Sequence, residues 1–190
     1  MYLAPRAPGQ EAIVVASGVA YAARSANLSQ MGVTFHGSML LMAKFLSLNY
    51  LWVAIRVQGG AYGAGLSLRP NGSIFSYSYR DPNPARTLET YKGMADFLRT
   101  SESIPLEQTI IGAIADSEPL LDAKDESQLA VTRALRGTTL EKKRRERREL
   151  LGATREDLLR AMNRLSSVLY LLMIREKAGG EPQSGRKTGQ

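Results

Sequence analysis

The sequence predicts an α+β domain in which helices pack on one face of a mainly antiparallel sheet. Three observations lead to this prediction. A Pro-Asn-Gly turn at residues 70–72 separates two segments with alternating side chains, an apolar helical segment precedes them, and helical patterns fill the second half. With 190 residues, 44% of them hydrophobic, the chain suffices for one buried core. We expect a single domain over residues 1–176 and a disordered polar tail over residues 177–190.

The first third predicts a strand and a buried helix. Residues 12–23 begin with β-branched side chains, which indicates a buried strand that leads into a loop. Residues 38–48 are apolar nearly all round, as in a buried helix, and we expect Asn49 to interrupt it before a second helical piece over residues 50–56. Charged and polar residues within residues 39–57 argue against a membrane span.

Two strands of a hairpin follow the Gly59-Gly60 stop. In residues 62–68, alternation places one set of side chains on one face: Tyr62, Ala64, Leu66 and Leu68. In residues 73–79, it places Phe75, Tyr77 and Tyr79 together, and we expect this aromatic face to pack in the core; stacking on nucleic-acid bases is the alternative.

The second half is predicted to be helical. Asn83-Pro84 is an N-cap signal for a helix that buries Leu88, Tyr91, Ala95 and Leu98. Further helices are expected over residues 105–115 and 123–135, and after the box-like pairs Thr138/Glu141 and Thr154/Asp157. Residues 167–174 fit a closing strand or the end of the last helix, and we favour the strand.

Composition excludes several site types. The chain has no cysteine and one histidine, His36, whereas catalytic zinc sites take two or three imidazoles, so we expect no metal bound by this chain. We interpret His36 as a turn or core residue. No secretory signal is visible in the first residues. The net charge is +7, and much of the excess lies in residues 141–149 and in the tail.

The densest candidate cluster is residues 56–65, RVQGGAYGAG. An arginine ends a buried helix, a Gly-Gly turn follows, and Tyr62 opens a strand. A guanidinium and a phenol close together can both donate hydrogen bonds to a carbonyl or carboxylate. The alternative is a structural helix–strand corner. A phosphate loop does not fit, because the chain runs here from helix to strand and lacks the Lys-Ser/Thr signature.

Several motifs in order resemble one family. The block LNYLWVAIRVQGGAYGAG, then SIFSYSYRDPNPARTLETYKGMADFL, IIGAIADSEPLLDAKDES and LLGATREDL, are similar to the C-terminal domain of presequence-protease-type zinc metallopeptidases of the pitrilysin/insulinase superfamily. The similarity covers most of residues 49–159. It implies a half-domain of the pitrilysin/mitochondrial-processing-peptidase type.

The resemblance also implies roles. In that family two halves enclose an unstructured peptide, and the N-terminal half carries zinc on His-x-x-Glu-His, a motif that this chain lacks. Arg56 and Tyr62 fall on the family's substrate-binding arginine and tyrosine, with Gly59 and Gly60 between them; Tyr62 would stabilise the transition state in the assembled enzyme. The expected partners are the zinc-bearing half, in the same polypeptide or a separate chain, and peptide substrates. The chain alone should not hydrolyse peptides.

Two alternatives from other classes remain. The basic cluster Arg144, Arg145, Arg147 and Arg148 fits a module that binds nucleic acid or anionic surfaces, although helically spaced acids make a solvated face the simpler reading. A degenerate, purely structural domain is the other. We expect a cytoplasmic location, with an organelle matrix as the alternative.

Overall fold

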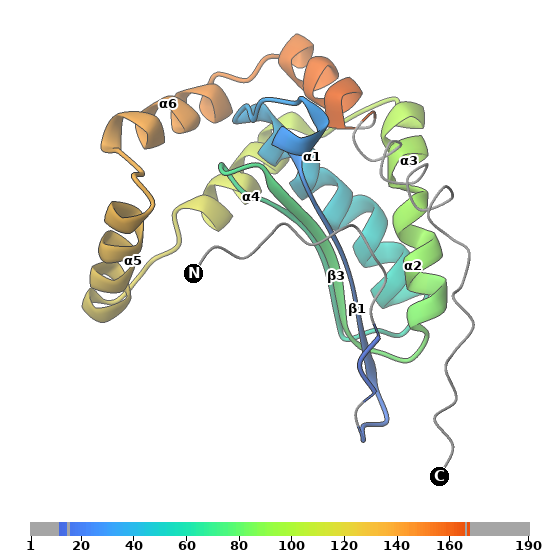
Figure 1. Ribbon diagram of the computed structural model, residues 1–190. Helices are drawn as coiled ribbons and strands as arrows, with labels where there is room; N and C mark the ends of the chain where they lie inside the picture. The colour runs from blue at the N-terminus through green and yellow to red at the C-terminus, as the bar shows by residue number, and fades with distance from the viewer. Residues whose placement is uncertain (1–11, 15, 166, 168–190) are drawn as a thin grey trace.

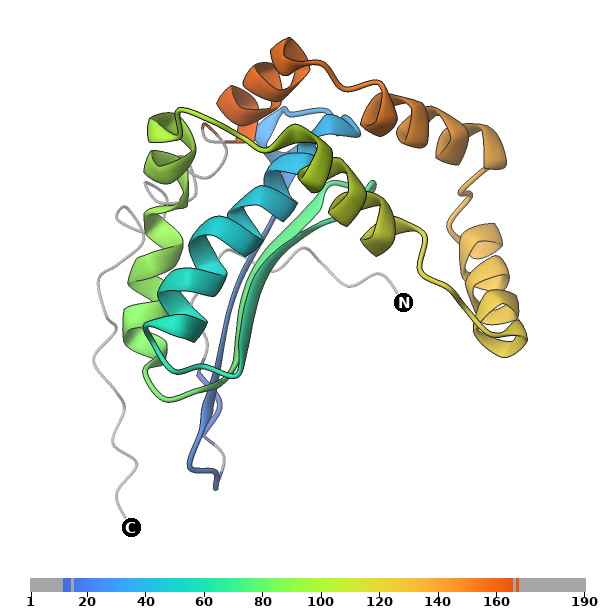
Figure 2. The ribbon, with the colours of Figure 1, turned by 180° about the vertical axis from the view of Figure 1, so that it is seen from behind.

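The computed structural model describes residues 12–14, 16–165 and 167, which build a three-stranded antiparallel sheet with helices on one face (Figure 1). The strand order is β1-β3-β2, with β1 at Ala20–Asn27, β2 at Gly63–Leu68 and β3 at Ser73–Asp81. The predicted α+β class with helices on one face of an antiparallel sheet is confirmed. The reverse view shows the helical layer in front of the sheet (Figure 2).

Strand β1 begins later than the sequence predicts. Residues 16–19 lie before the strand, and Ile13 and Val14 are 83% and 97% exposed, so the predicted buried strand over residues 12–23 is wrong in its bounds. The pairing with β3 runs from Ala20 to Asn27 and sets the true limits. β-Branched side chains favour a strand only where a partner strand is available.

The central helix is continuous but changes from α-helical to π-helical hydrogen bonding along its length. Helix α1, Ser38–Leu46, runs directly into the π-helical segment η2, Ser47–Val57, so the predicted interruption at Asn49 is wrong. Asn49 Nδ2 instead donates to the Phe45 carbonyl at 3.1 Å. Ser47 Oγ donates to the Ala43 carbonyl at 2.8 Å and accepts the Leu66 N–H at 2.9 Å, which joins the helix to β2 where the winding changes.

This helix is apolar enough to resemble a membrane span. Ser38–Val57 has 20 residues and contains an 18-residue window with a mean hydropathy of 1.5, which meets the length and composition of a crossing helix, and half of that window is buried inside the protein. Leu41, Met42, Leu46 and Leu51 are fully buried, with the helix packed on β2. Core helices of soluble proteins meet the same criterion, so composition alone is a weak indication of a membrane.

The hairpin turns its aromatic side away from the helices. Ile74, Ser76 and Ser78 of β3 are buried, whereas Tyr77 and Tyr79 are 37% and 38% exposed, so the predicted core position of the aromatic face is wrong. Alternation groups the side chains correctly, but contacts with the helices decide which group is buried. Ser76 Oγ, for example, contacts Met94 Sδ at 3.8 Å in the helical layer.

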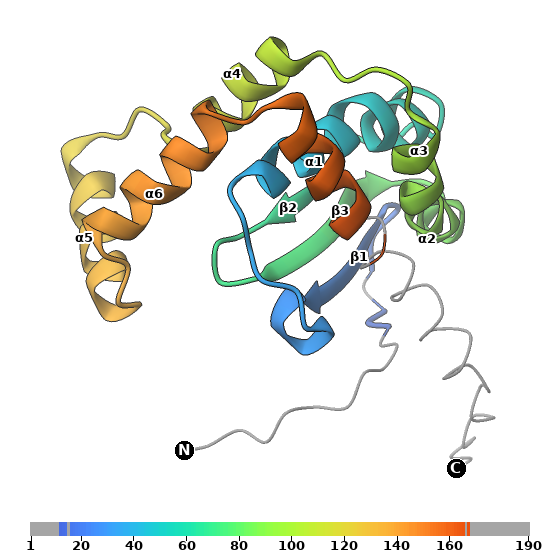
Figure 3. The ribbon, with the colours of Figure 1, turned by 90° about the horizontal axis from the view of Figure 1, so that it is seen from above.

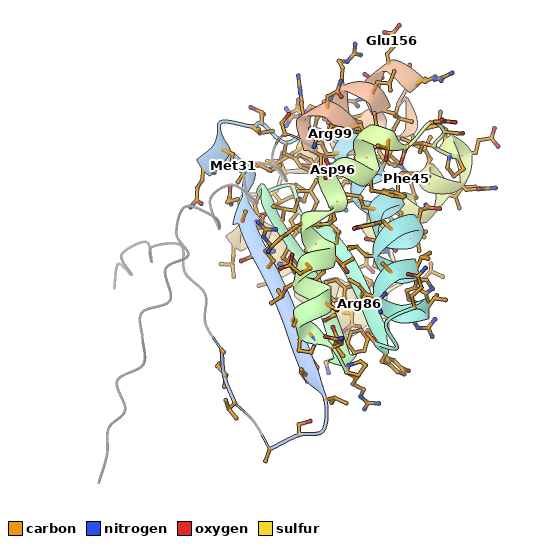
Figure 4. All side chains as sticks on the ribbon, turned by 90° about the vertical axis from the view of Figure 1, so that its right-hand side faces the viewer. Met31, Phe45, Arg86, Asp96, Arg99 and Glu156 are labelled. Carbon is orange, nitrogen blue, oxygen red and sulfur yellow. The ribbon has the colours of Figure 1, made fainter. Side chains whose placement is uncertain are left out.

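Two helices complete that layer. Helix α2, Pro84–Lys92, begins at Asn83, whose side chain accepts the Arg86 N–H as predicted, and Gly93 separates it from α3, Met94–Thr100. Of the predicted apolar face, Tyr91, Ala95 and Leu98 are buried, but Leu88 is 42% exposed, because the buried face of α2 runs through Thr87 and Tyr91. Figure 4 views this side, with the paired Asp96 and Arg99 on α3.

The remaining helices are α4, Leu106–Ser117; α5, Ala123–Leu135; α6, Leu140–Leu151; and an unlabelled helix from residue 155 to residue 165. Helix α4 packs on α1, whereas α5 and α6 form an arm that reaches away from the sheet (Figure 3). Helix α5 has the predicted bounds, and Thr154 and Asp157 form the predicted capping box. Thr139, not Thr138, caps α6. Residues 168–174 of the expected closing strand and the expected tail lie outside the described residues, whereas Ser167 is helical.

Candidate functional site

The corner between η2 and β2 is shaped by its two glycines. Gly60 has φ = +78°, and its N–H donates to the Arg56 carbonyl at 3.0 Å, which closes the helix end. A Cβ on Gly59 would lie 2.5 Å from the Ile55 carbonyl oxygen, a distance that no side chain tolerates. These contacts give both glycines a role in the turn. Substrate binding by Gly59 and Gly60 stays a prediction.

Arg56 lies exposed at this corner and is held by two contacts. Its guanidinium carbon stacks 4.1 Å from the centroid of the Trp52 ring, one helical turn earlier. Its Nε donates to the Tyr62 main-chain carbonyl at 3.0 Å. These two contacts use the Nε and one face of the guanidinium and leave its Nη groups out of both.

Tyr62 lies beside Arg56 and is 59% exposed. Its N–H is shared between the carbonyls of Tyr79, at 3.2 Å, and Arg80, at 3.4 Å. Its ring lies 5.4 Å from the exposed Tyr79 ring, so it does not share the buried face of Ala64, as strict alternation predicts. The irregular pairing at the end of the hairpin turns Tyr62 outward, and the structure thus brings both predicted site residues to one exposed corner.

Arg80 is responsible for that irregular pairing. It has φ = +49° and is the one described non-glycine residue with positive φ. This left-handed backbone presents its carbonyl to Tyr62, and its guanidinium carbon lies 5.4 Å from the Tyr62 ring centroid. A non-glycine residue in this region carries a strain that must be compensated nearby, and such residues concentrate at functional sites.

The compensation comes from the next residue, Asp81, which is 2% exposed. Its Oδ2 accepts the hydroxyls of Ser78 at 2.7 Å and Thr87 at 2.6 Å, and its Oδ1 accepts the Asn83 N–H at 2.8 Å. Below this network, burial raises the pKa of the Tyr91 phenol, whose hydroxyl donates to the Ala22 carbonyl at 3.2 Å. Asp81 therefore joins the end of β3 to the start of α2, and Tyr91 joins α2 to β1.

Sequence reasoning missed the contributions of Trp52 and Arg80 to the corner. The segment 78–83 does indicate a strand-to-helix junction in which Asp81 can pair with Arg80 or bond nearby N–H groups, and Asp81 accepts the Asn83 N–H. The spacing of Trp52 and Arg56, four residues on a helix, is the one signal that pointed to their contact. No local pattern marks Arg80 as left-handed, because asparagine or glycine is the usual choice there. The three bonds of Asp81 join residues on both sides of a strand end, and a sequence shows no such convergence.

His36 lies at the other end of the molecule. Its Nδ1 is 2.8 Å from Ser38 Oγ, and its Nε2 is 3.9 Å from Glu149 Oε2, which also accepts the Gly37 N–H. These contacts agree with a turn histidine that joins the start of α1 to α6. Within the described residues, no group of three or more His, Asp or Glu side chains is placed to hold a metal ion.

The basic run lies on α6, away from the corner. Part of its charge is paired, since Arg147 lies 3.4 Å from Glu118 and Arg145 lies 3.8 Å from Glu149. Burial raises the pKa of Glu146 on the same helix despite the neighbouring cations Lys142 and Arg145. This arrangement is typical of a solvated helix whose inner edge contacts the domain.

Comparisons with known proteins identify one family. Residues 10–170 match the family described as the PreP C-terminal domain. The chain is 40% identical over 152 residues to presequence protease 1, chloroplastic/mitochondrial, of Arabidopsis thaliana, covering 77% of this chain and 14% of that protein. It is 33% identical over 150 residues to protein HypA of Clostridium perfringens, covering 78% and 15%.

A third relative is the mitochondrial presequence protease of Xenopus tropicalis, 31% identical over 133 residues, with 68% of this chain and 12% of that protein covered. The chain thus spans about a seventh of the length of the relatives from Arabidopsis and Clostridium. The match extends over the sheet, the corner with Arg56 and Tyr62, and the helical arm. The chain belongs to the family of presequence-protease C-terminal domains.

Proposed function

We propose that this chain is the non-metal-binding part of a zinc oligopeptidase that encloses and degrades unstructured peptides, and that Arg56 and Tyr62 act on the bound peptide. The observation that carries the proposal is the exposed corner in which a stacked guanidinium is hydrogen-bonded to the residue bearing the phenol. The names of the presequence proteases among the relatives supply the substrate class.

The chain itself does not fit zinc. It has one histidine and no cysteine, and the acidic side chains of its described part form no metal-binding cluster. In this proposal the metal is bound by a partner half, from the same polypeptide or another chain. When bound there, zinc supplies the activated water for peptide hydrolysis.

The roles of the two residues follow from their chemistry. The Tyr62 phenol donates a hydrogen bond to the peptide oxygen on which negative charge develops, which stabilises the transition state more than the ground state. The Arg56 Nη groups bind a neighbouring substrate carbonyl or the C-terminal side of the peptide and position it. Because the Trp52 ring and the Tyr62 carbonyl hold the guanidinium in place, binding costs little side-chain entropy.

The test uses the full-length enzyme that contains this domain and a quenched fluorescent peptide. Tyr62→Phe should lower kcat about a hundredfold with little change in KM, the usual effect of losing one transition-state donor. Arg56→Ala should chiefly raise KM. Tyr21→Phe is the matched control, since it removes a phenol from a similarly exposed ring outside the candidate site and should leave both constants unchanged.

Two results would overturn the proposal. Unchanged turnover in both Tyr62→Phe and Arg56→Ala would support the purely structural alternative. Chelator-sensitive cleavage by the 190-residue chain alone would show that it carries its own metal site.

The compartment also belongs to the proposal. The names of the plant and frog relatives place those proteins in chloroplasts or mitochondria, which favours the organelle matrix over the cytoplasm for this chain. The relative from Clostridium is bacterial, so the domain type is not confined to organelles. Localisation of a tagged full-length protein in the source cells tests this part.

A further inference from the structure

A row of four aromatic rings runs over the open face of the sheet from the candidate site to the hairpin turn. In order it consists of Tyr62, Tyr79, Tyr77 and Phe75, which we call the aromatic row. The ring centroids of Tyr62 and Tyr79 are 5.4 Å apart, and those of Phe75 and Tyr77 are 5.8 Å apart. Tyr77 and Tyr79 are each more than one third exposed, on the face opposite the helices.

Two rings of the row, those of Tyr79 and Tyr77, lie close over β2, where the facing residues are glycines. Gly63 pairs with Tyr79 and Gly65 with Tyr77. A Cβ on Gly63 would come within 2.3 Å of the Tyr79 ring, and one on Gly65 within 2.9 Å of the Tyr77 hydroxyl. Each ring thus covers a glycine with one face and leaves the other face available for stacking.

An arginine lies at each end of the row. At the site end, the Arg80 guanidinium carbon is 5.4 Å from the Tyr62 ring centroid. At the turn end, that of Arg69 is 5.5 Å from the Phe75 ring centroid. Both cations use the ring faces as supports, so the row is an apolar platform bounded by positive charge.

We propose that the aromatic row binds an extended stretch of the substrate peptide whose side chains are aromatic or aliphatic, with an acidic group preferred at the Arg69 end. This rests on the proposed function, in which the peptide is cleaved beside Tyr62. Phe75 and Tyr79 are four strand residues apart, roughly 13 Å, which matches about four residues of an extended peptide.

Three features favour a peptide as the occupant. The row begins at the proposed site, so a peptide bound at Tyr62 reaches it without a change of direction. On the other side of β3, Ala23 faces Tyr77 and Ser25 faces Phe75, so small side chains leave room at the turn end of the row, whereas the exposed Tyr21 flanks Tyr79 at the site end. The terminal arginines repel a cationic segment and attract a carboxylate.

The test compares short and long peptides in the full-length enzyme. The short quenched peptide carries two residues on each side of the cleaved bond. Each long peptide adds five residues to one side of the short peptide, and both sides are tried in turn. The added residues are either aromatic and aliphatic or only Ser and Gly. The extension ends in either Asp or Lys. We expect Tyr77→Thr to raise KM for the long apolar peptide about fivefold, with kcat and the short peptide unaffected.

Arg69→Glu provides a second variant that removes no ring. It should abolish or reverse an Asp-over-Lys preference, expected at about threefold in KM in the wild type. The matched control is Leu88→Gln, an apolar residue of similar exposure to Tyr77 but on the helical side. It should change no constant for any peptide.

The outcomes separate this inference from the proposed function. If Tyr62→Phe slows cleavage but Tyr77→Thr leaves the KM of the long apolar peptide unchanged, or shifts short and long peptides equally, the inference is wrong and the proposed function stands. If Tyr77→Thr instead increases the hydrodynamic radius of the enzyme on gel filtration, the row is an inter-domain contact and the inference is also overturned. Failure of Tyr62→Phe alone to affect kcat counts against the proposed function.

Discussion

Asp81 offers a sharp test of how the strand end beside the site is held. Its side chain is 2% exposed and accepts three hydrogen bonds, from Ser78, Thr87 and the Asn83 N–H. Asp81→Ala removes all three at once and leaves buried donors without a partner. A hydrogen bond to a charged group contributes about 1.5–3 kcal/mol, but part of the total is offset by the desolvation of the carboxylate.

We therefore expect Asp81→Ala to lower the free energy of unfolding by about 3–4 kcal/mol, a large share of a domain stability of about 5–15 kcal/mol. Asp81→Asn should cost only about 1 kcal/mol, because the Ser78 and Thr87 hydroxyls can rotate and accept from the new amide. The assay is urea unfolding of the 190-residue chain, followed by far-ultraviolet circular dichroism.

Asp96→Ala is the control for Asp81→Ala. Asp96 is an exposed carboxylate that pairs with Arg99 on the same helix, so its loss should change stability by less than about 0.5 kcal/mol. If Asp81→Ala costs no more than Asp96→Ala, the network does not stabilise the strand end and the reasoning is refuted.

Three further predictions concern the rest of the domain. Gly93→Ala should destabilise the chain by about 2 kcal/mol in urea unfolding, because the new Cβ would lie 2.1 Å from the Tyr50 hydroxyl. Adding Tyr50→Phe should recover part of the lost stability. Wild-type stability of Gly93→Ala would contradict the contact. Burial raises the pKa of Glu146, so its charged form opposes folding only at higher pH. Glu146→Gln should therefore raise Tm at pH 7 and lose this advantage below about pH 4. An equal Tm of both proteins at pH 7 would count against this prediction. Hydrogen bonds from Thr154 and Arg160 hold the pKa of Asp157 well below its usual range. The ionised Asp157 therefore stabilises the folded state above the unfolded pKa of about 3.9, and this stabilisation is lost as the pH falls below that value. Asp157→Asn should flatten the decline of Tm between pH 5 and pH 2, and an unchanged slope would refute this.

Much of the fold follows from local chemistry. The Pro-Asn-Gly turn, the Asn83 cap, the bounds of α5 and the Thr154/Asp157 box all depend on residues within a few positions of one another, and the structure confirms each. The spacing of Arg56 and Tyr62 around two glycines is local too, and both residues reach one exposed corner.

The tertiary structure decided the rest, because those features depend on contacts between distant segments. Alternation in β3 groups Phe75 with Tyr77 and Tyr79, but only the helices packed on Ile74, Ser76 and Ser78 determine that the aromatic side faces outward. Pairing with β3 sets the bounds of β1 at Ala20–Asn27. The left-handed backbone of Arg80 lies where Tyr62 points away from the core. A local pattern sets which side chains share a face, whereas burial of one face is a property of the whole packed domain.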